Sequence, residues 1–148
     1  MRPDFFEQFP TQADLGKYLK SKPETANTTA SQFIKDHLPK ESVFQAKIIA
    51  AVEDWKKKRW IDPDTIIWKN NAGVYNRNGL PDLMMVSNGK FFAFEVKRPY
   101  LGRLSPLQKK AIVDISLAGG RANAVSYPSE VKRALMEYDS WFGGEGGE

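Results

Sequence analysis

Three residues able to hold or stabilise charge, Asp82, Glu95 and Lys97, lie within one short stretch of the chain. Asn88-Gly89 separates the two apolar runs of this stretch and is the strongest short-range signal for a two-residue β-hairpin turn. Such a turn fixes the register, and counting outward from it places Asp82 directly opposite Glu95. Opposite residues share a face, and Lys97, two residues beyond Glu95, points to that same face. Two carboxylates and an ammonium group should therefore converge at the open end of a hairpin.

Like charges directly opposite each other destabilise a sheet, so this arrangement favours a divalent cation between the two carboxylates. There is an ordinary alternative: Glu-x-Lys on a strand is usually a solvated face, and Pro81-Asp82 can simply be a turn that opens the strand. The flanking residues argue against it, because both faces of the hairpin are otherwise apolar. A hairpin that is apolar on both faces belongs in the interior of a sheet, where charges need partners or a metal.

The composition narrows the choice of metal. The chain has no cysteine and one histidine, His37. Disulfides and thiolate metal sites are therefore excluded, and a single histidine argues against zinc hydrolysis by a histidine cluster. A metal held by oxygen alone points to Mg²⁺ or Mn²⁺.

With 148 residues, the chain is long enough for one domain with a substantial core. Its net charge is +4, and the excess is concentrated in residues 41–110, which carry thirteen Lys and Arg against seven Asp and Glu. A basic middle suggests a polyanionic partner, nucleic acid first. No apolar run approaches membrane-spanning length and the N-terminus does not resemble a signal peptide. We therefore expect a cytoplasmic protein without a membrane association.

Residues 1–40 form an accessory segment. The sequence predicts short helices over 11–20 and from a cap at Ser31 to Leu38, with a polar loop over 22–29. This segment carries apolar residues, and the sequence leaves open whether they pack on the core or on a second copy of the protein.

Residues 41–142 carry the pattern of a core: helix, three strands, helix, strand, helix. The first helix runs from Glu41 to about Trp60, and a strand follows over 65–68 before the hairpin. Ser105, Pro106 and Gln108 mark the start of the next helix, with Gln108 completing a capping box, and its sheet-facing residues should be Ala111, Ile112, Ile115 and Ala118. A strand over 122–127 and a helix over 129–142 complete the core, and the glycine-rich tail 143–148 should be disordered.

Two loops are suited to contacts with nucleic acid. The loop from Asn70 to Gly79 is rich in amides and glycine, and a second loop follows Lys97. An ordinary surface loop is an equally good interpretation of the first. We expect nucleic-acid contacts from five residues: Lys69, Tyr75, Arg77, Arg98 and Arg103. The basic run 56–59 either complements the helix dipole or contacts phosphate.

Three motifs occur in order: Gly79-Leu80-Pro81-Asp82, then Glu95-Val96-Lys97, then Leu104-Ser105-Pro106-Leu107-Gln108. In this order and at these spacings they resemble the VRR-NUC family, a branch of the PD-(D/E)xK nuclease superfamily. The resemblance covers residues 41 to about 135. It implies an α/β fold with a restriction-endonuclease-like α-β-β-β-α-β core, in which helices flank a central mixed sheet.

The resemblance also implies roles for individual residues. Asp82, Glu95 and the main-chain carbonyl of Val96 would ligate Mg²⁺ or Mn²⁺, and Glu41 matches an acidic residue that the family often brings to this site. Lys97 would position or activate the attacking water, or stabilise charge on the phosphate. Gln108 would hold the substrate phosphate or orient the lysine.

The resulting hypothesis is a metal-dependent, structure-selective DNA endonuclease that hydrolyses phosphodiester bonds and acts as a homodimer. Stand-alone members of the family resemble phage and bacterial enzymes of four-way junctions, so a Holliday junction resolvase is the favoured form, in a bacterial or phage-infected cell. The alternatives are a flap or duplex nuclease in phage replication or restriction, and a catalytically inactive nucleic-acid-binding module.

Overall fold

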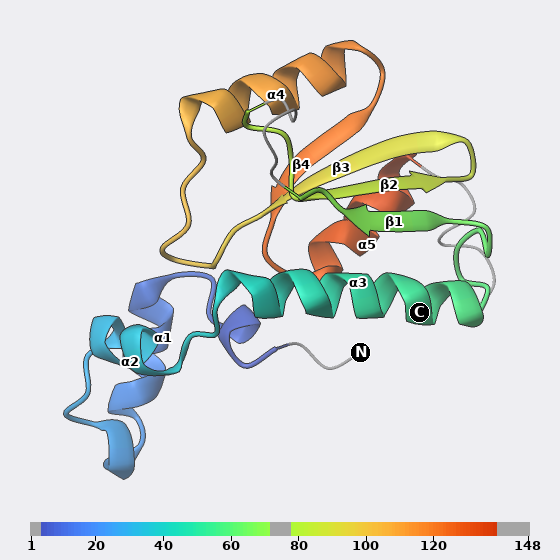
Figure 1. Ribbon diagram of the computed structural model, residues 1–148. Coiled ribbons are helices and arrows are strands. Elements are labelled where there is room, and N and C mark those ends of the chain that lie inside the picture. The colour runs from blue at the N-terminus through green and yellow to red at the C-terminus, as the bar shows by residue number, and fades with distance from the viewer. Residues whose placement is uncertain (1–3, 72–77, 139–148) are drawn as a thin grey trace.

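The computed structural model describes residues 4–71 and 78–138. Its helices and strands follow in the order α1 (Gln12–Lys20), α2 (Ala30–His37), α3 (Glu41–Lys57), β1 (Ile66–Lys69), β2 (Leu83–Ser87), β3 (Lys90–Val96), α4 (Pro106–Leu117), β4 (Arg121–Val125) and α5 (Pro128–Tyr138), with short 3₁₀ helices at Phe6–Gln8 and Pro23–Thr25. Figure 1 shows α4 on one side of the sheet and α3 and α5 on the other. The predicted α/β class and the α-β-β-β-α-β order from α3 to β4 are confirmed.

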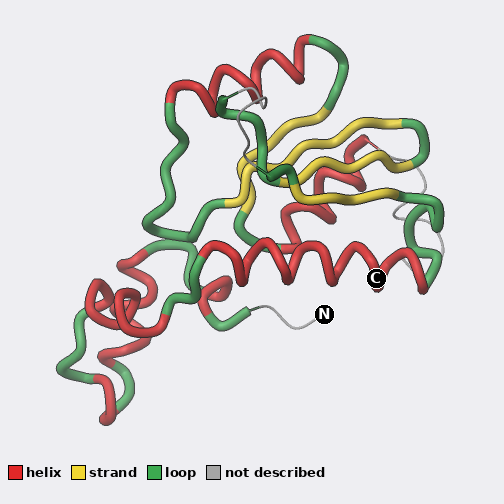
Figure 2. Tube along the Cα trace, in the orientation of Figure 1, coloured by secondary structure: helices red, strands yellow, loops and turns green. Residues whose placement is uncertain are grey.

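The four strands form one mixed sheet in the order β1-β2-β3-β4. β1, β2 and β3 are antiparallel neighbours, and β4 lies parallel to β3 because α4 carries the chain back across the sheet. The hairpin therefore occupies the two central positions, as its two apolar faces predict. Figure 2 shows the strands as one layer between the helices.

The hairpin has the predicted register. Ser87 pairs with Lys90 and Met84 with Ala93 across the turn. Asn88 and Gly89 both have positive φ, at 49° and 73°, as a type I′ turn requires. The turn chemistry thus fixes which residues meet at the other end of the hairpin.

Two hydrophobic clusters lie on opposite faces of the sheet. The larger includes Phe44, Trp55, Phe92, Phe94 and Leu135, which come from α3, β3 and α5. The smaller consists of Met84, Ala93 and Ala122, against which Ile112 and Ile115 of α4 pack. The predicted sheet-facing residue Ala118 is exposed, because it is the C-cap residue of α4 and lies beyond the last turn.

The N-terminal segment packs on its own chain. Phe6, Leu15, Leu19 and Ile34 are buried in the same cluster as the core residues of α3 and the sheet. Figure 1 shows α1 and α2 beside the start of α3, away from the sheet. Much of the apolar surface expected to meet either the core or a second copy is therefore used within the chain.

Two helix boundaries and one strand end differ from their predictions; β4 ends at Val125, where the strand was predicted to run to 127. α2 is capped by Thr29, whose hydroxyl accepts from the Gln32 amide, and not by Ser31. α3 ends at Lys57, earlier than predicted, and Arg59 has a φ of 57°. The predicted last turn of the final helix, over 139–142, and the tail 143–148 lie outside the described residues.

Within the described part of the chain, no helix has the length and apolar character needed to cross a membrane.

Candidate active site

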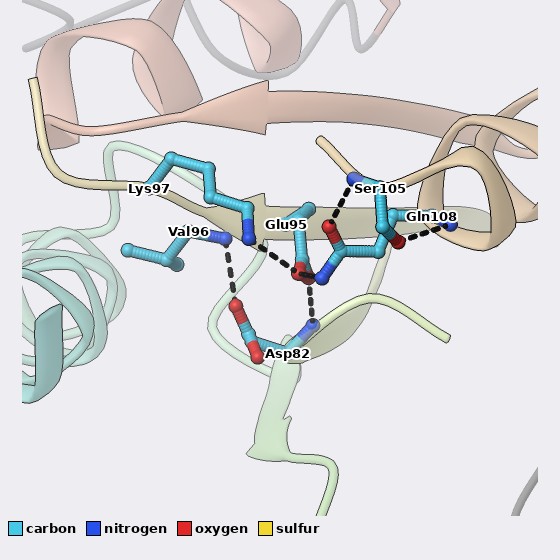
Figure 3. Close-up of polar contacts among 6 residues, drawn as sticks. All are labelled: Asp82, Glu95, Val96, Lys97, Ser105 and Gln108. Atoms are coloured by element: carbon cyan, nitrogen blue, oxygen red, sulfur yellow. Dashed lines mark hydrogen bonds and ion pairs between the residues drawn. The ribbon is translucent and has the colours of Figure 1, made fainter. Parts of the chain in front are cut away.

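Asp82 and Glu95 meet at the open end of the hairpin, one residue beyond the last ladder pair of Leu83 with Phe94. The Asp82 amide donates to Glu95 Oε2 at 3.1 Å, and the Val96 amide donates to Asp82 Oδ2 at 2.9 Å. Figure 3 shows each carboxylate beside a backbone amide of the other strand, the Asp82 carboxylate at the Val96 amide and the Glu95 carboxylate at the Asp82 amide. The predicted convergence of the two acidic residues is present.

The backbone before Asp82 is held against the start of α4. Gly79 has a φ of 83°, and a Cβ placed on it would lie 2.7 Å from the carbonyl carbon and oxygen of Leu107. Only glycine fits such a close approach at this conformation. Leu80 then packs against the smaller cluster. The Gly-Leu-Pro-Asp motif thus brings Asp82 to the same place as the first turn of α4.

Replacing Gly79 with alanine should therefore destabilise the packing of the Gly-Leu-Pro-Asp segment against α4. Positive φ and the clash with Leu107 backbone should cost about 1–3 kcal/mol of unfolding free energy, measured by urea denaturation. Gly89→Ala is the matched control: it also has positive φ, at 73°, but its Cβ would meet nothing within 4 Å. Equal losses in the two variants would show that contact with α4 is unimportant.

Lys97 and Gln108 complete the cluster around Glu95. Lys97 Nζ lies 3.6 Å from Glu95 Oε1, and Gln108 Nε2 donates a hydrogen bond to the same oxygen. Gln108 also closes the predicted capping box: its Oε1 accepts from the Ser105 amide at 2.9 Å, and its own amide donates to Ser105 Oγ at 3.2 Å. One residue thus caps α4 with its oxygen and contacts Glu95 with its nitrogen, as Figure 3 shows.

The backbone at Lys97 is fixed on three sides. The Lys97 amide donates to the Val125 carbonyl at 2.9 Å, and Ser126 Oγ donates to the Lys97 carbonyl at 2.6 Å. A Cβ on Gly102 would lie 2.6 Å from Lys97 Cβ, so the following loop folds directly onto the lysine. The backbone from which the Lys97 side chain extends is therefore held by the end of β4, by Ser126 and by this loop.

The loop after Lys97 is fastened to the N-terminal segment. Arg98 donates from Nε to the Pro39 carbonyl at 2.9 Å and from Nη2 to the Leu38 carbonyl at 3.0 Å. Tyr100 Oη donates to the Phe6 carbonyl at 3.0 Å. Arg98, predicted to contact nucleic acid, thus directs donors to its own chain.

Burial shapes the electrostatics of the pair. Glu95 is only 2% exposed. This burial and the neighbouring Asp82 charge raise the pKa of Glu95 to about 7, while the Lys97 ammonium opposes the shift. Near neutral pH the metal-free site therefore holds a proton on Glu95 for part of the time, and a divalent cation could take the place of that proton.

The other predicted metal ligands stand apart from this pair or contact it differently. Within residues 4–71 and 78–138, no group of three or more His, Asp or Glu side chains is arranged to hold a metal, so Glu41 does not join Asp82 and Glu95 in such a group. Val96 contacts the site through its amide, which donates to Asp82.

The predicted nucleic-acid contacts are dispersed. Lys69 and Arg103 are exposed, on β1 and in the loop before α4. Tyr75 and Arg77 lie outside the described residues. In the basic run, Lys58 pairs with Asp54 at 2.9 Å and Lys56 with Glu53 at 3.3 Å on the same helix. These pairs favour the helix-stabilising interpretation of the run.

Comparisons with known proteins add one distant likeness. No protein-family model matches the chain, and a search of curated proteins gives no match. Among solved structures, one chain superposes with a TM-score of 0.48 at 18% identity, over 65% of this chain and 97% of its own. It is described as "VRR_NUC domain". That is the family the three motifs resemble, although at this distance the chemistry of the site has to be judged from this chain's own residues.

Proposed function

We propose that this protein is a metal-dependent DNA nuclease that hydrolyses phosphodiester bonds at Asp82 and Glu95. The observation that carries the proposal is the convergence of four groups: the Asp82 carboxylate, the Lys97 ammonium and the Gln108 side-chain amide lie around the Glu95 carboxylate. The family resemblance of the motifs supplies the reaction class, and the basic middle of the sequence supports a nucleic-acid substrate.

The donor set suits Mg²⁺ or Mn²⁺. Both ions prefer oxygen, and Mg²⁺ in particular is commonly held by one or two carboxylates, with water and substrate phosphate completing its shell. Asp82 and Glu95 would supply the carboxylates and Val96 the main-chain carbonyl. A third acidic side chain is not required for this arrangement, which is consistent with the position of Glu41 outside it.

When bound, such an ion polarises the phosphate and lowers the pKa of coordinated water. The residues of the chain perform the remaining tasks. The Lys97 ammonium, 3.6 Å from Glu95 Oε1, would stabilise the negative charge that develops on the phosphate, or position or activate the attacking water. Gln108 holds the Glu95 carboxylate in place through its side-chain nitrogen.

We favour branched DNA as the substrate, with a Holliday junction as the leading case and a flap or plain duplex as the alternative. A junction needs two symmetric cuts, which two copies of a single-site domain could supply, and two-fold dimers are the commonest homo-oligomers. Because Phe6, Leu15, Leu19 and Ile34 are buried within the chain, the dimer contact is better sought outside them. Light scattering of the intact protein should show a dimer, whereas a monomer that still makes paired cuts would contradict it.

Cleavage of labelled junction, flap and linear duplex, measured side by side with Mg²⁺, Mn²⁺ or chelator, tests the proposal. We expect metal-dependent cleavage, fastest on branched DNA. Tight DNA binding with no cleavage under any metal would instead support an inactive binding module. Equal cleavage rates on all three substrates would support a nuclease but reject selectivity for branched DNA.

The proton on Glu95 gives a stability test. Because its folded pKa of about 7 exceeds the ordinary 4.5, the folded protein binds more protons between these values. Metal-free stability should therefore fall as the pH rises from about 4.5 to 7. Mg²⁺ should raise the melting temperature most above pH 7, where it no longer competes with the proton. Thermal melts of Glu95→Gln should show neither the fall in stability between pH 4.5 and 7 nor the stabilisation by Mg²⁺. If the stability of Glu95→Gln fell with pH as steeply as that of the wild type, another group would cause the fall.

A further inference from the structure

Among residues 4–71 and 78–138, no helix covers one side of β1. On the α4 side of the sheet, the buried residues are Met84, Ala93 and Ala122, from β2, β3 and β4. Next to them, Ile66 is 60% exposed, Trp68 42% and Val86 38%. We call these three residues the Trp68 surface. Exposed apolar groups that adjoin one another on an edge strand and the strand beside it are unusual, and they mark a site of contact.

The Trp68 surface shares a face with the proposed catalytic pair. Ile66 pairs with Val86 and Trp68 with Met84, so these side chains point to one side of the sheet. Asp82 lies two residues before Met84 and therefore on that side as well. The Asn70 amide donates to the Asp82 carbonyl at 2.7 Å, which brings β1 directly alongside the site. Trp68, two residues before Asn70, is about 7 Å away along the strand.

We infer that the Trp68 surface receives an unpaired base of the DNA strand that is cut at Asp82 and Glu95. This inference rests on the proposed function and deepens it. Bases within a duplex are covered by their neighbours, whereas an unpaired base offers a free π face. An exposed indole can stack on any such base irrespective of sequence.

The spacing agrees with this occupant. Trp68 lies about 7 Å from the level of Asp82 along the strand direction and one strand spacing, about 5 Å, to the side, so a base on Trp68 and a phosphate at the carboxylates could belong to neighbouring nucleotides of one strand. The base on Trp68 would belong to the strand whose phosphate lies at the carboxylates. The substrate class would then be DNA with unpaired bases beside the cleavage point, as at flaps and branch points.

The test measures binding to oligonucleotides that carry 2-aminopurine, a fluorescent base quenched by stacking. Asp82→Asn protein is used, so that no cleavage intervenes. One DNA presents the probe unpaired in a short flap, and the other has it within a full duplex. Trp68→Thr removes the ring while keeping strand propensity, and Trp68→Phe keeps an aromatic face. Leu117→Ala, at an 81% exposed position on α4, is the control.

Trp68→Thr should bind the flap roughly 5- to 150-fold more weakly and lose the quenching, with duplex affinity changed less than about twofold. Trp68→Phe should retain most of both signals, and Leu117→Ala should match the parent. Undiminished flap binding by Trp68→Thr, or equal losses on both DNAs, would overturn the inference. The inference would also be overturned if Trp68→Thr changed the protein from dimer to monomer and left the quenching intact, because the Trp68 surface would then contact a second copy of the chain. Cleavage by the wild type in Mg²⁺ is measured separately. If the wild type cleaved no DNA, the proposed nuclease activity would be rejected, whereas the fluorescence test of base stacking would keep its own result.

Discussion

Glu95→Gln and Asp82→Asn should each abolish DNA cleavage while leaving the fold and DNA binding nearly intact. Each change removes a proposed metal ligand but little volume. The amide oxygens can still accept from the Asp82 and Val96 amides respectively. Loss of a residue that only hydrogen-bonds to a metal ligand typically reduces metal affinity or activity by about 10- to 100-fold. Loss of a ligand itself should therefore reduce the cleavage rate by more than about 100-fold. Single-turnover cleavage in saturating Mg²⁺ measures this effect.

The same amide substitutions at exposed acidic residues provide the control. Glu137→Gln on α5 and Asp64→Asn before β1 should keep wild-type rates. In the absence of metal, Asp82→Asn should also be at least as stable as the wild type above pH 7, because it removes a charge that disfavours ionised Glu95. A folded Glu95→Gln or Asp82→Asn protein with near wild-type turnover would refute the assignment of the site.

Gln108→Glu separates the capping role of this residue from its contact with Glu95. Glutamate serves equally well in a capping box, so α4 should remain capped and the protein should remain folded. Its second oxygen, however, would replace the amide nitrogen that now donates to Glu95 Oε1, and two carboxylates would face each other. We expect cleavage to fall by about 10- to 100-fold, the range typical of residues that support a metal ligand.

Asn123→Asp is the control for this change, since it adds the same charge at an exposed position on β4. Circular dichroism establishes that both variants are folded before their rates are compared. If folded Gln108→Glu cleaved DNA normally, Gln108 would be a helix cap and nothing more. If Asn123→Asp lost as much activity, overall charge and not the contact with Glu95 would be the cause.

The hairpin and the pairing of its acidic residues could be predicted because local chemistry dictates them. Asn88-Gly89 favours a two-residue turn, and this turn fixes which residues of the two strands pair. Counting outward from the turn places Asp82 opposite Glu95. The capping box of α4 is likewise local, since Ser105 and Gln108 are three residues apart. Such features need no knowledge of distant packing.

The remaining features depend on contacts between distant parts of the chain. The carbonyls that Arg98 binds lie about sixty residues earlier, at Leu38 and Pro39. The position of Glu41 depends on how α3 lies against the sheet. The exposure of Trp68 depends on which half of the sheet α4 covers, and periodicity within β1 contains no information about that. The close approaches of Gly79 to Leu107 and of Gly102 to Lys97 likewise depend on how the loops pack, which the sequence around each glycine does not contain.

Binding of Mn²⁺, measured by electron paramagnetic resonance, tests the central claim most directly, because it detects the ion without requiring turnover or a known substrate. The wild type should bind Mn²⁺ above pH 7, Mg²⁺ should compete for the site, and Glu95→Gln or Asp82→Asn should lose most of the bound signal while Glu137→Gln retains it. Equal Mn²⁺ binding by the wild type and by Glu95→Gln would contradict a metal site at this pair of carboxylates.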